Sequence, residues 1–159
     1  MTWRSELLQR LQDVRGNCKT RNQLYAINRT SPSYLAARHL REQAQLEDAG
    51  FCIATQILTE FYSTVTNPRR FNPPLTVEQA AQEVENIKTL AGVIRLPLPL
   101  DVADLWLSLV RQYRVSRSDI YDTLLVATML ENQVRRIYTF NVDDFRLYPD
   151  IEVLVPPAP

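Results

Sequence analysis

The sequence predicts an α/β fold in which helices cover both faces of a parallel β-sheet. Short apolar, strand-like runs alternate along the chain with longer segments of helical periodicity. No two strand-like runs are separated by the short turn that marks a β-hairpin. Because parallel strands are joined through crossover helices, this alternation indicates a helix-covered parallel sheet.

The composition indicates one globular domain without an overall affinity for polyanions. The chain has 159 residues, with 18 basic and 18 acidic side chains, so nucleic-acid binding would need a local patch. Cys18 and Cys52 are the only cysteines, which argues against a disulfide framework or a zinc site. No run resembles a membrane span or a signal peptide, so we expect a soluble, cytoplasmic protein.

The first half of the chain contains one clear helix–strand–helix pattern. Gly50, in the position of a left-handed helix terminator, separates a helix from a buried strand. The predicted elements, in order, are a helix over 3–14, a polar linker over 15–23, a helix over 32–48 with Ser31 as cap and Pro32 at its first position, a strand over 51–54 and a helix over 56–66.

The second half continues the alternation. Thr76 and Gln79 form a capping box for a helix to about residue 90, which Gly92 terminates. The remaining predicted elements are a strand over 93–98 limited by Pro97 and Pro99, a helix over 101–113 capped by Asp101, a helix over 118–130 capped by Ser118 or Asp119, a strand over 136–140 and a strand over 151–155 before a proline-rich tail.

Acidic side chains follow the strands or begin the helices. Glu60 lies in the helix after one strand, Asp122 in the first turn of a nearly all-apolar helix, and Asp144 just after the strand over 136–140. In parallel α/β sheets, ligands bind outside the carboxyl ends of the strands. Carboxylates that converge there are tolerated when a divalent cation neutralises them, and oxygen ligands favour Mg²⁺ or Mn²⁺. Such a site hydrolyses phosphodiesters through a metal-activated water.

Each carboxylate also has a simpler explanation. The carboxylate of Asp122 would stabilise its helix by about 0.3–1 kcal/mol through a favourable interaction with the helix dipole, without binding any ligand. Glu60 could be a solvated helix residue, and Asp144 could cap the turn before Phe145. Spacing alone therefore leaves the metal site as one of two interpretations.

Four segments resemble the PIN-domain ribonucleases, and within them the VapC-like toxins of bacterial toxin–antitoxin pairs. The segments are LYAINRTSPSYLAARHL at 24–40, ILTEFYSTVTNP at 57–68, DIYDTLLVATML at 119–130 and IYTFNVDDF at 137–145. They cover most of the chain from residue 24, in the order and with the spacing of the family. The resemblance implies a three-layer α/β/α PIN-like fold and a Mg²⁺-dependent endoribonuclease of single-stranded RNA. It also implies a homodimer that a cognate antitoxin protein inhibits.

The same resemblance assigns roles to individual residues. Glu60 corresponds to the second acidic ligand, Asp122 to the third, and Asp144 or Asn141 to the fourth; Thr139 would supply a hydroxyl near the site. Basic side chains close to these positions would contact the RNA backbone, and they are Arg69, Arg70, Arg135 and Arg136. Ordinary surface charge is the alternative for each of the four.

The N-terminus departs from the family. Members begin with an apolar strand that ends in an Asp, and this chain has Thr20 there, or Lys19 if the register shifts by one residue. We therefore expect an atypical helix and linker over 1–23, a PIN-like domain over 24–155 with a degenerate or replaced first strand, and a tail over 156–159. Two functions stay open, a nuclease impaired by loss of the first Asp and a silent module that binds RNA or a protein.

Overall fold

A computed structural model of the protein describes residues 34–46 and 50–156. The predicted helix and linker over 1–23 and the Ser31-Pro32 helix start lie outside these ranges. The described elements are α3 (Tyr34–Gln43), β1 (Phe51–Ala54), α4 (Thr55–Val65), α5 (Val77–Lys88), β2 (Val93–Leu96), α6 (Val102–Tyr113), α7 (Asp119–Glu131), β3 (Arg136–Tyr138), the 3₁₀ helix η1 (Val142–Phe145) and β4 (Glu152–Leu154).

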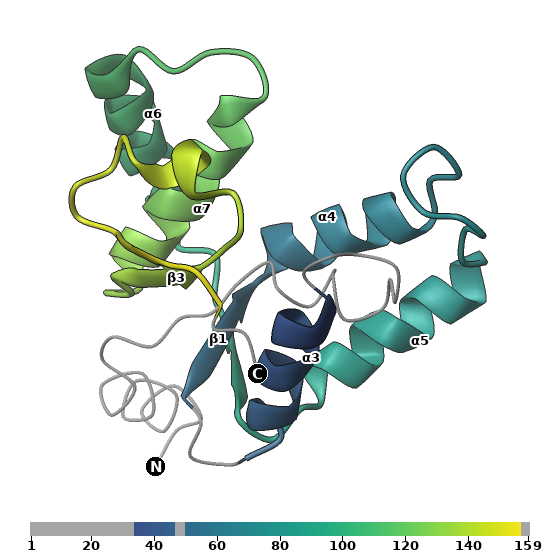
Figure 1. Ribbon diagram of the computed structural model, residues 1–159. Coiled ribbons are helices and arrows are strands. Elements are labelled where there is room, and N and C mark those ends of the chain that lie inside the picture. The colour runs from purple at the N-terminus through teal and green to yellow at the C-terminus, as the bar shows by residue number, and fades with distance from the viewer. Residues whose placement is uncertain (1–33, 47–49, 157–159) are drawn as a thin grey trace.

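The described strands form two parallel pairs, which confirms the predicted strand direction. β1 pairs with β2, with Phe51 opposite Val93, and β3 pairs with β4, with Arg136 opposite Glu152. Helices α6 and α7 lie with β3 on one side of β1, and α3, α4 and α5 lie on the other (Figure 1). The structure is therefore an α/β fold in which helices connect and cover parallel strands.

One hydrophobic core joins the two strand pairs. It contains buried side chains from β1, α4, α7, β3 and η1, among them Ile53, Phe61, Val126, Ile137 and Phe145. A smaller cluster around Leu40, Ala44 and Phe51 also touches Tyr138 of β3. Both clusters therefore contain residues from each half of the chain, and neither strand pair is an independent unit.

Helix α7 is buried on most of its surface, as its apolar sequence predicts. Its buried residues are Thr123, Leu125, Val126, Ala127, Thr128 and Met129. The two threonines stay satisfied in the core because each hydroxyl donates to the carbonyl four residues earlier, Thr123 to Asp119 at 2.9 Å and Thr128 to Leu124 at 2.9 Å. Helix α6 packs along α7 and separates part of it from solvent.

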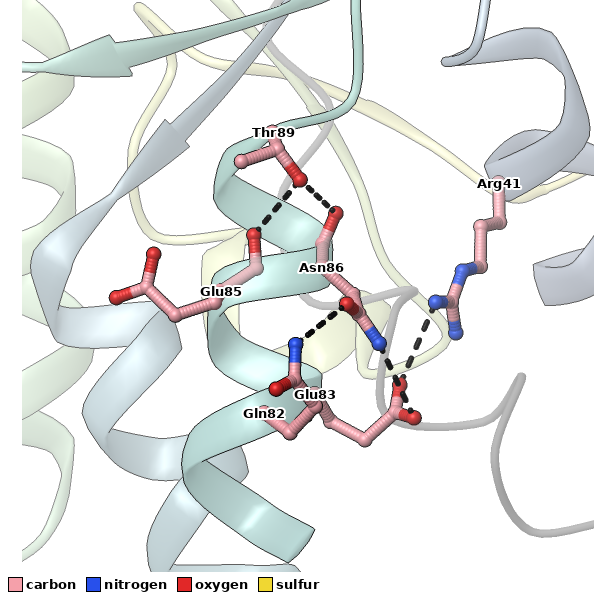
Figure 2. A network of polar contacts seen from close by, with 6 residues as sticks. All are labelled: Arg41, Gln82, Glu83, Glu85, Asn86 and Thr89. Atoms are coloured by element: carbon pink, nitrogen blue, oxygen red, sulfur yellow. Dashed lines mark hydrogen bonds and ion pairs between the residues drawn. The ribbon is translucent and has the colours of Figure 1, made fainter. Parts of the chain in front are cut away.

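Polar contacts hold α3 against α5. The guanidinium of Arg41 lies 3.4 Å from a carboxylate oxygen of Glu83, and the Asn86 amide donates to the other oxygen at 3.4 Å. Figure 2 shows this group reaching from α3 to the outer surface of α5, where Gln82 donates to Asn86 at 3.1 Å. Helix α5 begins with the predicted capping box, in which Thr76 and Gln79 bond each other's backbone N–H.

The two described glycines differ in their roles. Gly50 has a φ of 64°, which is the left-handed conformation predicted for it. Gly92 is not left-handed, because α5 already ends at Lys88, so its predicted role as helix terminator is wrong. Gly92 is instead buried between two segments: its N–H donates to Ala44 at 2.9 Å and its carbonyl accepts from Phe51 at 2.9 Å.

Helix ends also correct three predictions. Helix α3 ends at Gln43, short of the predicted residue 48, and a turn follows over 44–46. Asp101 and Ser118 occupy the N-cap positions of α6 and α7, but neither side chain accepts a cap hydrogen bond. The reason is the backbone: Ser118 has φ −65° and ψ −28°, and Asp101 has φ −93° and ψ 7°, whereas a capping side chain needs an extended residue.

The core of α7 should dominate the stability of the protein. Met129 is 0% exposed, so Met129→Ala should lower the free energy of unfolding by about 2–5 kcal/mol through lost burial and a cavity. Leu100→Ala is the control, because Leu100 is 99% exposed and its truncation should change stability by less than about 0.5 kcal/mol. Urea denaturation of both variants measures the difference, and equal effects would contradict a core centred on α7.

Candidate functional site

The first turn of α7 is anchored on two sides, and Asp122 lies in this turn. The Trp106 indole of α6 donates to the carbonyl of Ile120 at 3.1 Å. The Thr123 hydroxyl donates to the Asp119 carbonyl and lies 2.8 Å from the hydroxyl of Tyr148. These contacts hold the carboxylate of Asp122, which is half-buried, at the start of a helix whose dipole favours negative charge.

Tyr148 is the buried partner that the sequence did not single out. Its ring meets Tyr113 edge-on, with centroids 5.2 Å apart and planes at 77°. Burial raises the pKa of its phenol above the ordinary value of 10.0, the Thr123 hydrogen bond opposes that rise, and the charges of Asp122 and Asp119 add to it. The neutral phenol is thus the form that the folded protein favours.

Asp144 lies beyond the carboxyl end of β3. The turn that carries it is short because Phe145 enters the core with 0% exposure and ends η1. The preceding carboxylate, Asp143, pairs with Arg146 at 2.8 Å. Because α7 leads into the start of β3, the head of α7 is at the carboxyl end of this strand, and η1 packs against α7. The structure therefore places η1, which carries Asp144, against α7, which carries Asp122 in its first turn.

Thr139 and Asn141 shape the chain between β3 and η1. Thr139 is 1% exposed, and its hydroxyl accepts a hydrogen bond from the backbone N–H of Asn141 at 3.0 Å. The backbone N–H of Thr139 donates to Leu154 at 3.0 Å. Asn141 is exposed and occupies the N-cap position of η1 without a side-chain cap bond. In this geometry Thr139 orients the turn, and Asn141 presents its amide to solvent.

Glu60 projects from α4, which follows β1 with no intervening loop. The Gln56 amide, in the first turn of α4, donates to the Thr128 hydroxyl of α7 at 2.7 Å. Glu60 is exposed and lies four residues after Gln56, and residues at this spacing share one face of a helix. Glu60 therefore belongs to the side of α4 that touches α7, one turn further from β1.

The predicted basic residues have two kinds of surroundings. Arg69 and Arg70 are exposed in the turn after α4, where the Arg69 N–H donates to the Asn67 side chain at 2.9 Å. Arg136 pairs with Glu152 at 2.6 Å, and Arg135 lies 4.0 Å from Asp150. Because carboxylates already offset the charges of Arg135 and Arg136, these two are the weaker candidates for a phosphate contact.

The acidic residues do not form a metal centre on their own. Within 34–46 and 50–156, no group of three His, Cys, Asp or Glu side chains is placed to hold a metal ion. Thr20 and Lys19, the alternatives for the first ligand position, lie outside the described residues and carry no carboxylate. The described residues thus fit a divalent cation only incompletely, and the sites predicted at Glu60, Asp122 and Asp144 stay predictions.

Comparison with known proteins identifies the family to which the chain belongs. The family model described as PIN domain matches residues 22–150, most of the chain. The chain belongs to the PIN domain family. PIN domains are in general nucleases and typically depend on a divalent cation. No curated protein sequence matches the chain.

Two solved structures share the fold. A toxin–antitoxin complex from Klebsiella pneumoniae superposes with a TM-score of 0.56 at 17% identity, over 91% of this chain and 100% of that chain. VapBC2 from Rickettsia felis, bound to a DNA fragment from its promoter, gives a TM-score of 0.58 at 16% identity, over 87% of this chain and 97% of that chain. At these identities the likeness shows the PIN fold alone.

No described helix of this chain has the length and hydropathy that crossing a bilayer requires.

The raised pKa of Tyr148 predicts a pH-dependent stability. Its contribution is complete below the unfolded pKa near 10 and is lost as pH rises through the higher folded pKa. Tyr148→Phe should lower the free energy of unfolding at about pH 7 by about 0.5–1.5 kcal/mol, because the Thr123 hydrogen bond is lost.

Urea denaturation at about pH 7 and about pH 11 measures both effects. Between these pH values the native chain should lose more stability than Tyr148→Phe, since the variant has no phenol at this position to ionise. The comparison isolates the phenol of Tyr148, because no other side chain differs between the two proteins. An equal alkaline loss in the two proteins would show that Tyr148 ionises as freely in the folded as in the unfolded chain.

Proposed function

We propose that this protein is a single-stranded-RNA endonuclease of the VapC toxin type with an incomplete acidic site. The observation that supports the proposal is the contact between α7, which carries Asp122 in its first turn, and η1, which carries Asp144, in a chain that belongs to the PIN domain family. Glu60, Asp122 and Asp144 are the proposed ligands, with Mg²⁺ or Mn²⁺ as the cation that their oxygen atoms favour. Asn141 would orient groups around them, and Arg69 and Arg70 would contact phosphates.

A second function is favoured by the incomplete fit for a metal. No described trio of acidic residues is gathered for a cation, and the sequence offers Thr20 or Lys19 where the family has its first Asp. A PIN domain that binds RNA or a protein without cutting would have this composition. Cleavage measured with and without a restored carboxylate distinguishes the two functions.

We also propose a cognate antitoxin as partner, a homodimeric state and a cytoplasmic location. The support for an antitoxin is that one structural neighbour is a toxin–antitoxin complex and the other is VapBC2 bound to a fragment of its promoter. Exposed leucines such as Leu98 and Leu100, in the segment between β2 and α6, are apolar positions that a protein partner would cover. Copurification with the product of an adjacent gene and light scattering of the purified chain test the first two proposals.

The nuclease proposal predicts weak cleavage that a carboxylate restores. With Mg²⁺ or Mn²⁺, the native chain should cut a mixed single-stranded RNA pool slowly, and Asp122→Asn should abolish the activity. Thr20→Asp should raise the rate by about tenfold or more, since even outer partners of a metal change activity by about 10- to 100-fold.

Lys19→Asp tests the alternative register. Asp150→Asn is the matched control, because Asp150 is an exposed carboxylate that lies 4.0 Å from Arg135. Gel analysis of end-labelled RNA gives the rates. If none of the proteins cuts, the enzyme proposal fails and the binding module stands. If Asp122→Asn cuts as fast as the native chain, the activity comes from elsewhere.

A further inference from the structure

One aromatic side chain is exposed beside the proposed acidic site. Tyr121 lies in the first turn of α7, next to Asp122, and is 70% exposed. Among the large apolar side chains that are exposed in the described ranges it is the one aromatic residue. An aromatic ring with a free face can stack on an unpaired base, a contact that tolerates any base because every base has a π-face.

The backbone around Tyr121 directs its ring outward. The neighbouring Ile120 carbonyl is held by Trp106 of α6, and the Thr123 side chain is buried against Tyr148. The Tyr121 N–H donates to the Ser118 carbonyl at 3.1 Å, which fixes the turn from which the side chain leaves the helix. The ring is therefore presented by a rigid backbone, and less conformational freedom is lost when a ligand stacks on it.

An uncompensated basic segment leads directly into this turn. Arg111 at the end of α6, Arg114 and Arg117 are all exposed, and no ion pair joins any of them to a carboxylate of residues 34–46 or 50–156. Arg114 and Arg117 have φ values of 53° and 58°, a conformation that residues with a Cβ rarely adopt. By contrast, Arg136 and Arg146 are paired at 2.6 and 2.8 Å. The positive charge of the α6–α7 segment is thus available to a ligand.

We propose that Tyr121 is a stacking platform for one base of single-stranded RNA and that Arg117 and Arg114 bind the adjoining phosphates. The choice of RNA as the ligand rests on the proposed function. The platform would be the part of the proposed site that holds the RNA strand. Without a bound cation, Asp119 and Asp122 repel phosphate, so the backbone of the strand would pass on the arginine side of Tyr121 while the base covers its ring. A duplex is excluded as the ligand because its base faces are already stacked.

A protein partner fits this surface less well. Protein interfaces are depleted of Asp and Glu, and both Asp119 and Asp122 lie beside Tyr121 along the chain. The exposed leucines at 98 and 100 are a more apolar surface for that purpose. Alternating aromatic and basic groups are typical of grooves that bind single strands.

The test is RNA binding measured without cleavage. Fluorescence anisotropy of a labelled single-stranded RNA 12-mer in EDTA gives Kd for the native chain and for Tyr121→Ala, Tyr121→Phe and Arg117→Gln. Tyr121→Ala should weaken binding about 5- to 100-fold, the range for one stacked base, and Tyr121→Phe should bind like the native chain. Arg117→Gln should weaken binding. It should also reduce the slope of log Kd against log salt concentration by the amount that corresponds to the loss of about one phosphate contact.

Two matched controls accompany these variants. Leu147→Ala removes another exposed apolar side chain, and Arg95→Gln removes another exposed arginine that lies on β2; both should bind RNA like the native chain. Thermal melts check that all variants fold. For the Tyr121 variants we expect normal folding, because this side chain is 70% exposed.

Several results would overturn the platform. It is wrong if the native chain does not bind the 12-mer, if Tyr121→Ala binds normally, if Tyr121→Phe is as weak as Tyr121→Ala, or if a duplex competes as well as the single strand. Loss of a protein partner with unchanged RNA affinity would assign the surface to that partner. Failure of cleavage together with Tyr121-dependent binding would remove the proposed nuclease activity and leave the platform intact.

Discussion

The burial of α7 is the constraint on which the rest of the structure depends. A helix that is apolar nearly all round has to be covered, and here α6, η1 and the first turn of α4 contribute to the cover. Its two threonines remain compatible with the core because their hydroxyls bond within the helix and also to Tyr148 and Gln56. The position of the acidic edge follows from this packing, since Asp122 occupies the end of the same helix that reaches solvent.

Acidic and basic residues lie close to one another along the segments that lead into α7 and η1. Asp119 and Asp122 begin α7, the η1 carboxylates follow β3, and two arginines in the left-handed conformation precede them. Carboxylates in this position favour cations, whereas arginines favour phosphates, and a polyanion bound through a cation needs both. The incomplete acidic set shifts this balance toward binding, because the basic and aromatic groups do not require a metal in order to act.

Local features of this protein could be predicted from sequence, and features that join distant segments could not. The bounds of β1, the Thr76–Gln79 capping box and the burial of α7 follow from periodicity and cap chemistry within one segment. The Thr123–Tyr148 hydrogen bond joins residues 25 positions apart, and no local pattern marks it. Gly92 was misassigned for the same reason: its place is set by contacts with Ala44 and Phe51 rather than by the helix before it. Of the site, the acidic ligands Glu60, Asp122 and Asp144 stay predictions. The exposure of Tyr121 could not be predicted from sequence, because it depends on tertiary packing.

The direct passage from β1 into α4 couples the register of a strand to the rotation of a helix. Ala54 is the last residue of β1 and Thr55 the first of α4, so no loop residue can absorb a change in length. One residue inserted at this junction would turn every side chain of α4 by about 100° relative to the strand. Gln56 would leave Thr128, and Glu60 would point away from α7 while the strand itself stayed paired. Across related chains, insertions and deletions should therefore be rare at this junction and more common in the turn over 67–76.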